Sequence, residues 1–253
     1  FPKLFLPQPH FNLLSYRNFL FNTDKEPHQM EQIKLSQVKK SYKNKVLYQN
    51  VNLSIHKGDS IALVGSNGSG KSVLFKLITG LEKPDSGEVW VDNQAIGRDV
   101  DFPEGVGILV NQPGYVEYYS GFKNLKLLAE IKNQIDDDQI KEAMNRVGLD
   151  PANKTMVREY STGMKQKLGI CQAIMEDQDI ILLDEPFNAL DFQTNKDILR
   201  LLTDLKAEGK TILLTSHQHS LLEQVCDKFY IIMNQEVTEM SDQLKKDYFT
   251  LLA

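Results

Sequence analysis

The sequence lacks the features that mark secreted, membrane-spanning or strongly basic proteins. Its 253 residues include only two cysteines, Cys171 and Cys226, whose wide separation and apolar surroundings argue against a disulfide framework or a metal site. We interpret both as reduced core thiols of a cytosolic protein. No run approaches the ~20 consecutive apolar residues that a helix needs to cross a bilayer. The net charge of -5 gives no global attraction to nucleic acid or to an anionic membrane, so we expect no nucleic-acid partner.

The apolar content is sufficient for a sizeable core. With 41% apolar residues, the chain fits one large domain or two lobes. A regular alternation of apolar and polar residues, typical of a half-buried strand, begins just after Met30, so we expect the folded domain to span residues 30–253. Residues 1–29 are rich in Phe, Leu and Pro but carry no cleavage site typical of a secretory signal. We expect this N-terminal extension to be non-native or partly disordered; a natural extension and a segment that docks on a partner are the alternatives.

A glycine-rich loop is the strongest chemical signal in the chain. Residues 65–72 read Gly-Ser-Asn-Gly-Ser-Gly-Lys-Ser, directly after an apolar run and directly before a helical pattern. A strand, a tight turn and a helix in this order point backbone N–H groups and the positive helix end at one place, where a polyphosphate can bind. A serine- and glycine-rich surface loop is the alternative. The pattern predicts that Lys71 reaches the β- and γ-phosphates and that Ser72 binds Mg²⁺. The predicted nucleotide-binding residues of the loop are Gly65, Ser66, Asn67, Gly68, Ser69, Gly70, Lys71 and Ser72.

Predicted strands surround this loop. Residues 46–56 and 60–64 flank a Lys-Gly-Asp turn, and residues 88–92 alternate after a Pro-Asp-Ser-Gly turn. We expect these strands to form a small antiparallel sheet around the base of the nucleotide.

The middle of the chain is predicted to be helical. Ser120 is a predicted N-cap for a helix through Lys132, and residues 136–138 cap another that stops at Gly148. We therefore expect residues 113–175 to form a helical lobe.

Buried strands return after the lobe. The apolar runs at residues 179–183 and 211–215 enclose a helical pattern at residues 195–207, which is typical of parallel strands joined by a crossover helix. The predicted fold class is α/β: a P-loop NTPase core with a mostly parallel sheet, a small antiparallel β subdomain and an inserted helical lobe. The core is assigned to residues 30–112 and 176–253.

Two carboxylates end one of these strands. Asp184 and Glu185 follow the apolar residues 180–183. A carboxylate at the C-terminal edge of a strand can hold the Mg²⁺ that Ser72 also binds, and the next one can point toward a water in line with the γ-phosphate. An acidic surface pair is the alternative, but the phosphate loop upstream favours a hydrolytic site.

The chain resembles the ATP-binding cassette of the ABC superfamily, from about Met30 to at least Glu236. The segment 160–166, Tyr-Ser-Thr-Gly-Met-Lys-Gln, resembles the family signature, and the segment 188–191, Asn-Ala-Leu-Asp, resembles the family D-loop. Many nucleotide hydrolases have a phosphate loop, but only this superfamily combines it with such a signature.

Single residues resemble further family positions. Gln112 resembles the Q-loop glutamine, His217 the switch histidine and Tyr42 the aromatic residue that stacks on adenine. The resemblance implies that Glu185, His217 and Gln112 are catalytic. The residues alone leave alternatives open, because Tyr42 is also typical of a half-buried strand and Gln112 of a solvated loop. We expect His219 to be an ordinary exposed histidine. The predicted Mg²⁺ ligands are Ser72, Gln112 and Asp184.

The signature implies that a second cassette completes the site. In the family, two cassettes sandwich two ATP molecules, and the serine and following amides of one contact the γ-phosphate held by the other. Thr162 stands where the family has glycine, and a β-branched residue needs an ordinary backbone conformation, which we expect here. Asp191 either contacts the second chain or caps the following helix. The residues predicted to contact ATP in trans are Ser161, Thr162, Gly163 and Asp191.

The variant signature resembles the cassettes of bacterial two-component exporters. It implies an ATPase that couples ATP hydrolysis to the export of a peptide, antibiotic or ion. Such a cassette is expected to be a homodimer, cytoplasmic and peripheral on the inner face of the cell membrane, bound to a separate transmembrane permease. An alternative is a soluble ABC-type ATPase that acts on an assembly scaffold or macromolecular complex. A cluster of aromatic residues is the predicted permease-docking surface, with core packing as the alternative: Gly114, Tyr115, Tyr118 and Tyr119.

Overall fold

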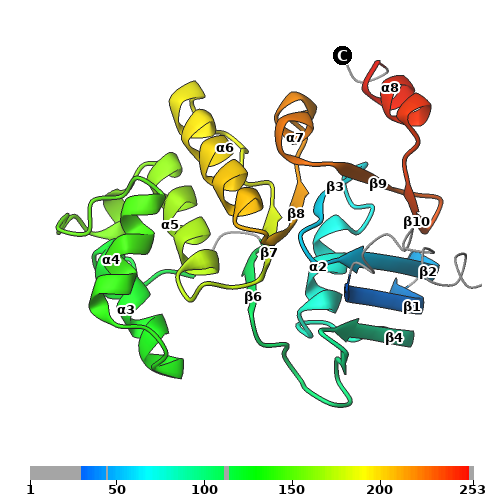
Figure 1. Cartoon of the computed structure of the whole chain (residues 1–253), viewed down its shortest axis with the longest axis horizontal. Coiled ribbons are helices and arrows are strands. Elements are labelled where there is room, and N and C mark those ends of the chain that lie inside the picture. Colours follow the sequence, from blue (N-terminus) through cyan, green and yellow to red (C-terminus); the bar gives the residue numbers. More distant parts are fainter. Residues whose placement is uncertain (1–29, 44, 111–113, 251–253) are drawn as a thin grey trace, which may run out of the picture. The chain divides into compact units, whose positions relative to one another are not determined.

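The computed structural model describes residues 30–43, 45–110 and 114–250. The chain divides into two compact units, Phe1–Met30 and Glu31–Ala253, and all the elements below belong to the second. Its strands are β1 Glu31–Tyr42, β2 Lys45–His56, β3 Ser60–Gly65, β4 Ser86–Val91, β5 Gln94–Ala95, β6 Val106–Leu109, β7 Ile180–Asp184, β8 Thr211–Thr215, β9 Lys228–Met233 and β10 Glu236–Glu239. They form two sheets (Figure 1), a four-stranded one in the order β2-β1-β4-β5 and a six-stranded one in the order β10-β9-β3-β8-β7-β6.

Helices cover the six-stranded sheet. Their sequence patterns match the structure closely: Ser120 caps α3 by accepting a hydrogen bond from Lys123 N at 3.3 Å, and Asp136 forms a capping box with Gln139 at the start of α4, so both predicted helix starts are confirmed. Within the described ranges, no helix combines the length and apolarity required of a bilayer span. The helices are α2 Lys71–Ile78, α3 Gly121–Lys132, α4 Asp137–Arg146, the short 3₁₀ helix η1 Val157–Glu159, α5 Thr162–Ile174, α6 Phe192–Ala207, α7 His219–Val225 and α8 Asp242–Thr250.

The six-stranded sheet separates two hydrophobic cores. In β3, Ala62 and Val64 belong to the core shared with α3, α4, α5, α6 and α7, whereas Ile61 and Leu63 belong to the core shared with α2 and the antiparallel sheet. The same alternation occurs in β7 and β8. Because both faces are covered, nearly every residue of β3, β7 and β8 is buried, and these strands read as continuous apolar runs.

The expected antiparallel placement of residues 60–64 is wrong. β3 pairs in parallel with β8 and β9, while β1 pairs antiparallel with β2 and β4. The physical reason is the composition of β3, which is apolar on both faces and therefore fits a doubly covered strand rather than a sheet with one exposed face. The α/β fold class itself, with a mostly parallel sheet and a smaller antiparallel one, is confirmed.

Strands β5, β6, β9 and β10 were not among the predicted strands. Strand β6 contains Gly107, and a Cβ added there would lie 1.7 Å from the carbonyl oxygen of Ala173 in α5, so only glycine permits this approach.

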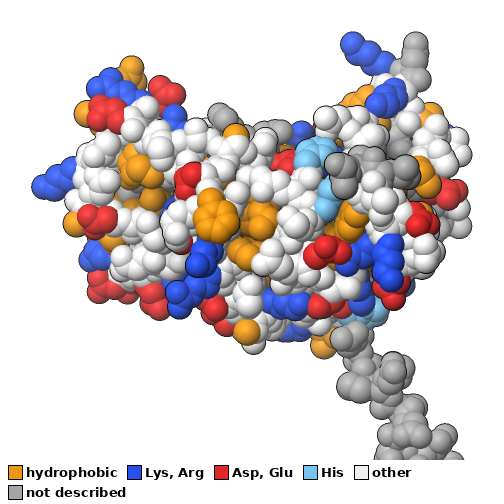
Figure 2. Space-filling view, turned by 90° about the horizontal axis from the view of Figure 1, so that it is seen from above, with side chains coloured by type: hydrophobic (Ala, Val, Ile, Leu, Met, Phe, Trp, Pro, Cys, Tyr) orange, Lys and Arg blue, Asp and Glu red, His pale blue; other side chains and the backbone are white. Residues whose placement is uncertain are grey.

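Cys171 and Cys226 are both buried free thiols, as predicted, and burial raises the pKa of each to about 12. On the face in Figure 2, hydrophobic side chains lie in small groups among charges of both signs.

Candidate active site

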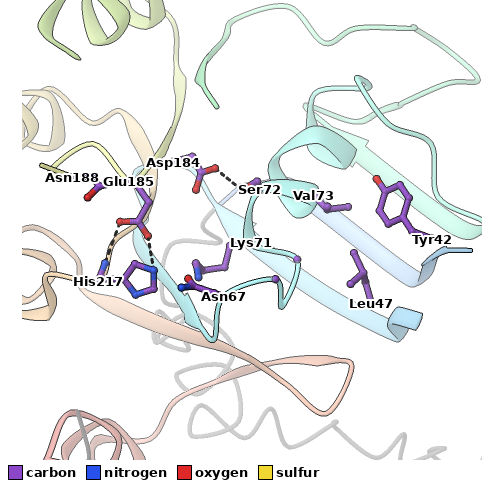
Figure 3. A pocket seen from close by; sticks show the side chains of 12 residues that line it. Tyr42, Leu47, Asn67, Lys71, Ser72, Val73, Asp184, Glu185, Asn188 and His217 are labelled. Carbon is purple, nitrogen blue, oxygen red and sulfur yellow. Dashed lines mark hydrogen bonds and ion pairs between the residues drawn. The ribbon is translucent and has the colours of Figure 1, made fainter. Parts of the chain in front are cut away.

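A pocket of about 540 Å³ lies at the C-terminal ends of the parallel strands. Figure 3 shows Tyr42, Leu47 and Val73 at one end and Asp184, Glu185 and His217 at the other, with Lys71 and Ser72 between them. The structure thus brings together most of the predicted site residues, which are far apart in sequence. Asn188, the first residue of the segment that resembles the D-loop, also lines the pocket. Leu47 and Val73 line it too but were not predicted, because an ordinary apolar side chain carries no signal in a sequence.

The glycine-rich loop requires glycine at defined points. Gly70, the N-cap of α2, has a φ of 115°, and a Cβ there would lie 2.5 Å from the hydroxyl oxygen of Tyr48. The Tyr48 hydroxyl donates a hydrogen bond of 2.5 Å to the carbonyl oxygen of Gly70. Gly68 has a φ of 72°, and its carbonyl oxygen accepts a hydrogen bond of 2.8 Å from Lys45 Nζ. The loop is therefore held from outside by β2.

Lys71 is a buried cation at the centre of the pocket. Its Nζ donates hydrogen bonds to the carbonyl oxygens of Gly65 at 2.9 Å and Ser66 at 3.4 Å. Burial lowers its pKa, and the carboxylates of Glu185 and Asp184 partly oppose this effect. A desolvated ammonium group beside backbone amides is suited to an anionic ligand.

The carboxylate of Asp184 is held on both sides. One oxygen accepts a hydrogen bond from the Ser72 hydroxyl, and the other accepts one of 2.6 Å from the Thr215 hydroxyl. Thr215 is the last residue of β8 and lies in register with Asp184. Thr215 was not among the predicted site residues, although its place at the end of an apolar strand, two residues before His217, is a usable signal.

Glu185 has a strained backbone and a fixed carboxylate. Its φ is 52°, in the left-handed region that residues with a Cβ rarely adopt. The imidazole Nε2 of His217 lies 3.4 Å from one carboxylate oxygen, and the backbone N–H of His217 donates to the other at 3.2 Å. His217 and Glu185, which the resemblance implies are catalytic, are therefore in contact in the structure.

Tyr42 ends β1 at the far end of the pocket. Its side chain is 39% exposed, and Lys40 Nζ lies 5.0 Å from the ring centroid. Burial, followed by its hydrogen bond to Glu82, raises the pKa of Tyr42 to about 12. The ring keeps an accessible surface beside Leu47 and Val73, which makes this end of the pocket the apolar one.

Comparison with known proteins identifies this arrangement. The ABC transporter family model matches residues 48–188. The chain belongs to the ABC transporter family. The cassette is 36% identical over 217 residues to the uncharacterized ABC transporter ATP-binding protein YybJ of Bacillus subtilis, covering 85% of this chain and 99% of that protein. It is 32% identical over 216 residues to the lantibiotic transport ATP-binding protein SrtF of Streptococcus pyogenes, covering 85% of this chain and 91% of that one.

A solved cassette has the same fold. The dimeric, post-hydrolysis structure of the ATP-binding cassette MJ0796, bound to ADP and phosphate, superposes with a TM-score of 0.74 and 26% identity. The match covers 83% of this chain and 98% of that one. Cassettes of this family are ATPases, and the chain is an ATPase of this family.

Ser161 and Thr162 of the signature lie outside the pocket and are exposed. Ser161 caps α5 by accepting a hydrogen bond of 3.1 Å from Met164 N, and Thr162 is the first helical residue, so its predicted ordinary backbone conformation is confirmed. Asp191 caps α6, with hydrogen bonds from Thr194 N at 2.9 Å and from the Thr194 hydroxyl at 2.7 Å. The helix-cap alternative for Asp191 is therefore present, and it explains why α6 starts at Phe192 rather than at residue 195. Gly163 packs against α6, since a Cβ there would lie 3.1 Å from Thr194 Oγ1.

The predicted docking surface is only partly exposed. Tyr118 is 66% exposed and has the Arg158 guanidinium 5.2 Å from its ring centroid. Tyr115 instead packs against the core, and its hydroxyl donates to the carbonyl oxygen of Lys165 at 3.0 Å, so the core-packing alternative holds for this residue. Gln112 lies outside the described residues.

The prediction that His219 is an ordinary exposed histidine is wrong. Its ring stacks on Phe249 of α8 with centroids 4.6 Å apart and meets Tyr248 edge-on at 5.8 Å. Burial, and to a lesser degree His217, lowers the pKa of His219. The aromatic partners come from a helix near the end of the described chain, which local sequence did not reveal.

Proposed function

We propose that this cassette is the nucleotide-binding subunit of a membrane exporter and that it hydrolyses ATP in the pocket described above. The observation that carries the proposal is the convergence of Lys71, Asp184, Glu185 and His217 on one pocket beside the glycine-rich loop. The pocket has an apolar end at Tyr42, Leu47 and Val73, and the buried ammonium group of Lys71 lies beside the glycine-rich loop at its centre, which suits a molecule with a flat base and a charged polyphosphate.

The residues of the pocket divide into base-binding and phosphate-binding groups. Tyr42 stacks on adenine, because its ring is partly accessible beside Leu47 and Val73. The phosphates lie against the N–H groups of the loop and against Lys71. The loop residues assigned to ATP are Gly65, Ser66, Asn67, Gly68, Ser69, Gly70, Lys71 and Ser72.

The donor set at the end of β7 fits Mg²⁺. The Ser72 hydroxyl and the Asp184 carboxylate are in direct contact, and both are hard oxygen ligands. One carboxylate and one hydroxyl are typical of a Mg²⁺ site whose other ligands are waters and substrate phosphates. When bound, Mg²⁺ neutralises charge on the phosphate oxygens. Gln112 remains a proposed third ligand.

Glu185 is the proposed general base. Its carboxylate would take the proton of the attacking water, and His217 holds it through the contacts of 3.4 Å and 3.2 Å. Among the described residues that line the pocket, the other carboxylate is that of Asp184, and its two oxygens accept hydrogen bonds from Ser72 and Thr215. We assign positioning roles to His217 and Gln112.

A second copy of the cassette completes the site in this proposal. Ser161, Thr162 and Asp191 are exposed and lie apart from the pocket of their own chain. Phe192, next to Asp191, is 83% exposed, which is unusual for a large apolar side chain. The dimeric state of the MJ0796 cassette supports a homodimer in which Ser161 and Gly163 of one chain contact ATP held by the other.

The transport role rests on the relatives. SrtF is a lantibiotic transport ATP-binding protein, which supports a peptide or antibiotic as cargo. A separate transmembrane permease would hold the cassette on the inner face of the cell membrane. The exposed ring of Tyr118, paired with Arg158, and the 45% exposed side chain of Val116 form the proposed docking surface.

Membrane recruitment tests this proposal. The cassette is expressed alone and together with a multispanning permease from the same genome, and the membrane fraction is assayed. We expect sedimentation with membranes only in the second case, and a loss of recruitment in Tyr118→Ala. Equal sedimentation in both cases, or stable association with a soluble complex instead, would favour the alternative of a soluble ABC-type ATPase that acts on an assembly scaffold.

A further inference from the structure

We propose that Thr215 is a positioning residue for ATP hydrolysis, whose hydroxyl orients both Asp184 and Glu185. The inference rests on the proposed roles of these two acids. It assigns a function to a buried side chain that does not line the pocket.

One hydroxyl serves both acidic residues. Thr215 Oγ1 donates a hydrogen bond of 2.6 Å to Asp184 Oδ1 and accepts one of 2.9 Å from the backbone N–H of Glu185. The residue is 0% exposed, so neither contact competes with bulk water. A hydroxyl has one donor, and here it is directed at the carboxylate.

The contact to Asp184 fixes the rotation of its carboxylate. Ser72 occupies Oδ2 and Thr215 occupies Oδ1, so the plane of the group is determined from two sides. Without the Thr215 hydroxyl, only the contact on the Ser72 side remains. The carboxylate would then turn away from the orientation in which it and Ser72 face the same Mg²⁺.

The contact to Glu185 holds an unfavourable backbone conformation. Glu185 has a φ of 52°, which is strained for a residue with a Cβ. Such a conformation persists only when the surroundings impose it. The N–H of Glu185 is bound by both the hydroxyl and the carbonyl oxygen of Thr215, the latter at 3.2 Å. Thr215 thereby sets the direction in which the proposed base leaves the strand.

Strand β8 contains a second buried threonine, Thr211, which is a matched control for Thr215. Thr211, at the other end of the strand, is also 0% exposed. Its hydroxyl likewise makes two hydrogen bonds, donating to Gln32 Oε1 at 2.5 Å and accepting from Gly58 N at 2.8 Å. It does not line the pocket. The same substitution at the two positions therefore separates the loss of a buried hydroxyl from the loss of a positioned site.

The test compares Thr215→Val, Thr215→Ser and Thr211→Val in the full chain. The measurements are the steady-state kcat and KM for ATP, the Mg²⁺ concentration that gives half the maximal rate, and Tm. We expect Thr215→Val to lower kcat about tenfold or more and to raise the Mg²⁺ requirement severalfold, since a hydrogen bond to a charged group is lost. Thr215→Ser keeps the hydroxyl and should stay within about threefold of the wild-type kcat. Thr211→Val should lower Tm but leave kcat within about twofold.

Three outcomes would overturn the inference. These are a wild-type kcat in Thr215→Val, an equal loss in Thr215→Ser, and an equal loss of kcat in Thr211→Val. If Thr215→Val does not fold, Thr215→Ala removes the same hydroxyl without the added methyl group, and the same criteria apply. Glu185→Gln distinguishes this inference from the proposed function: wild-type hydrolysis in that variant would remove the assigned base, whereas a normal Thr215→Val would leave the base in place and remove only its positioning residue.

Discussion

The pocket and the signature region of this cassette are built in different ways. In the pocket, Asp184 is bound by side chains from α2 and β8, so its partners are distant in sequence and largely buried. In the signature region, the side chains of Ser161 and Asp191 accept hydrogen bonds from groups three residues further along the chain, and both residues are exposed. The pocket is thus organised within one chain, whereas the signature region presents an ordered surface that is exposed in the single chain. We infer that the first supplies chemistry and the second supplies a contact to another molecule.

The largest effect is expected from removing the proposed base in the pocket. Glu185→Gln should lower the rate of phosphate release about a thousandfold, because the side chain can no longer accept a proton. Nucleotide binding should persist, and a dimer should accumulate with ATP, measured by light scattering after gel filtration. Glu142→Gln, on the exposed face of α4, is the control and should behave as wild type. Wild-type hydrolysis in Glu185→Gln would refute the assignment.

The second-largest effect is expected from changing the backbone shape of the glycine-rich loop. Gly70→Ala should weaken ATP binding about ten- to hundredfold, because the backbone has a φ of 115° and the added Cβ meets the Tyr48 hydroxyl at 2.5 Å. The matched control is Gly209→Ala, where φ is 82° but nothing lies within 4 Å of the added Cβ. That variant should lose about 1 kcal/mol of stability and no ATP affinity. Titration with a fluorescent ATP analogue measures the ATP affinity of both variants. Equal affinities would show that the close contact with Tyr48 is unimportant.

Replacing a cap in the signature region sharpens the comparison. Ser161→Ala should lower ATPase activity about tenfold while leaving ATP affinity of the single chain unchanged, since its proposed ligand is held by a second chain. Ser120→Ala removes an equivalent cap from α3. Each variant should lose about 1 kcal/mol of stability in thermal unfolding. If Ser120→Ala loses as much activity as Ser161→Ala, the signature serine acts only as a cap.

The smallest effect is expected at His219, which packs against α8 and does not line the pocket. Burial lowers the pKa of His219 in the folded state below its unfolded value of about 6.5. The unfolded state therefore binds more protons than the folded state when the pH lies near or below 6.5. The contribution of His219 to the free energy of unfolding is fully present above pH 6.5 and is lost as the pH falls below it. His219→Phe keeps the stacking on Phe249 and removes the titration. The fall in Tm between pH 7.5 and 5.5 should shrink by an amount on the order of one degree; an unchanged fall would show that His219 does not contribute to it.

Local signals were sufficient where neighbours in sequence supply the partners. The caps at Ser120 and Asp136, the strands at β7 and β8 and the loop before α2 were all predictable, because each depends on hydrogen bonds or periodicity within a few residues. The predictions that were wrong or missing concern features whose partners are distant in sequence. The parallel pairing of β3, the burial of His219 and the contacts of Thr215 depend on segments far along the chain.

The motifs and their order along the chain were sufficient to predict the ABC transporter family and the chemistry proposed for this protein: a phosphate loop, a segment that resembles the family signature, an acid pair after a buried strand, and a histidine after the next one. Tertiary structure decided which groups meet and how they are held. Strand β8 lies beside β7, and only that pairing directs the Thr215 hydroxyl at Asp184 and the backbone of Glu185. The physical reason is that residue types specify which hydrogen bonds are possible, whereas the packing of two cores against one sheet selects the ones that form.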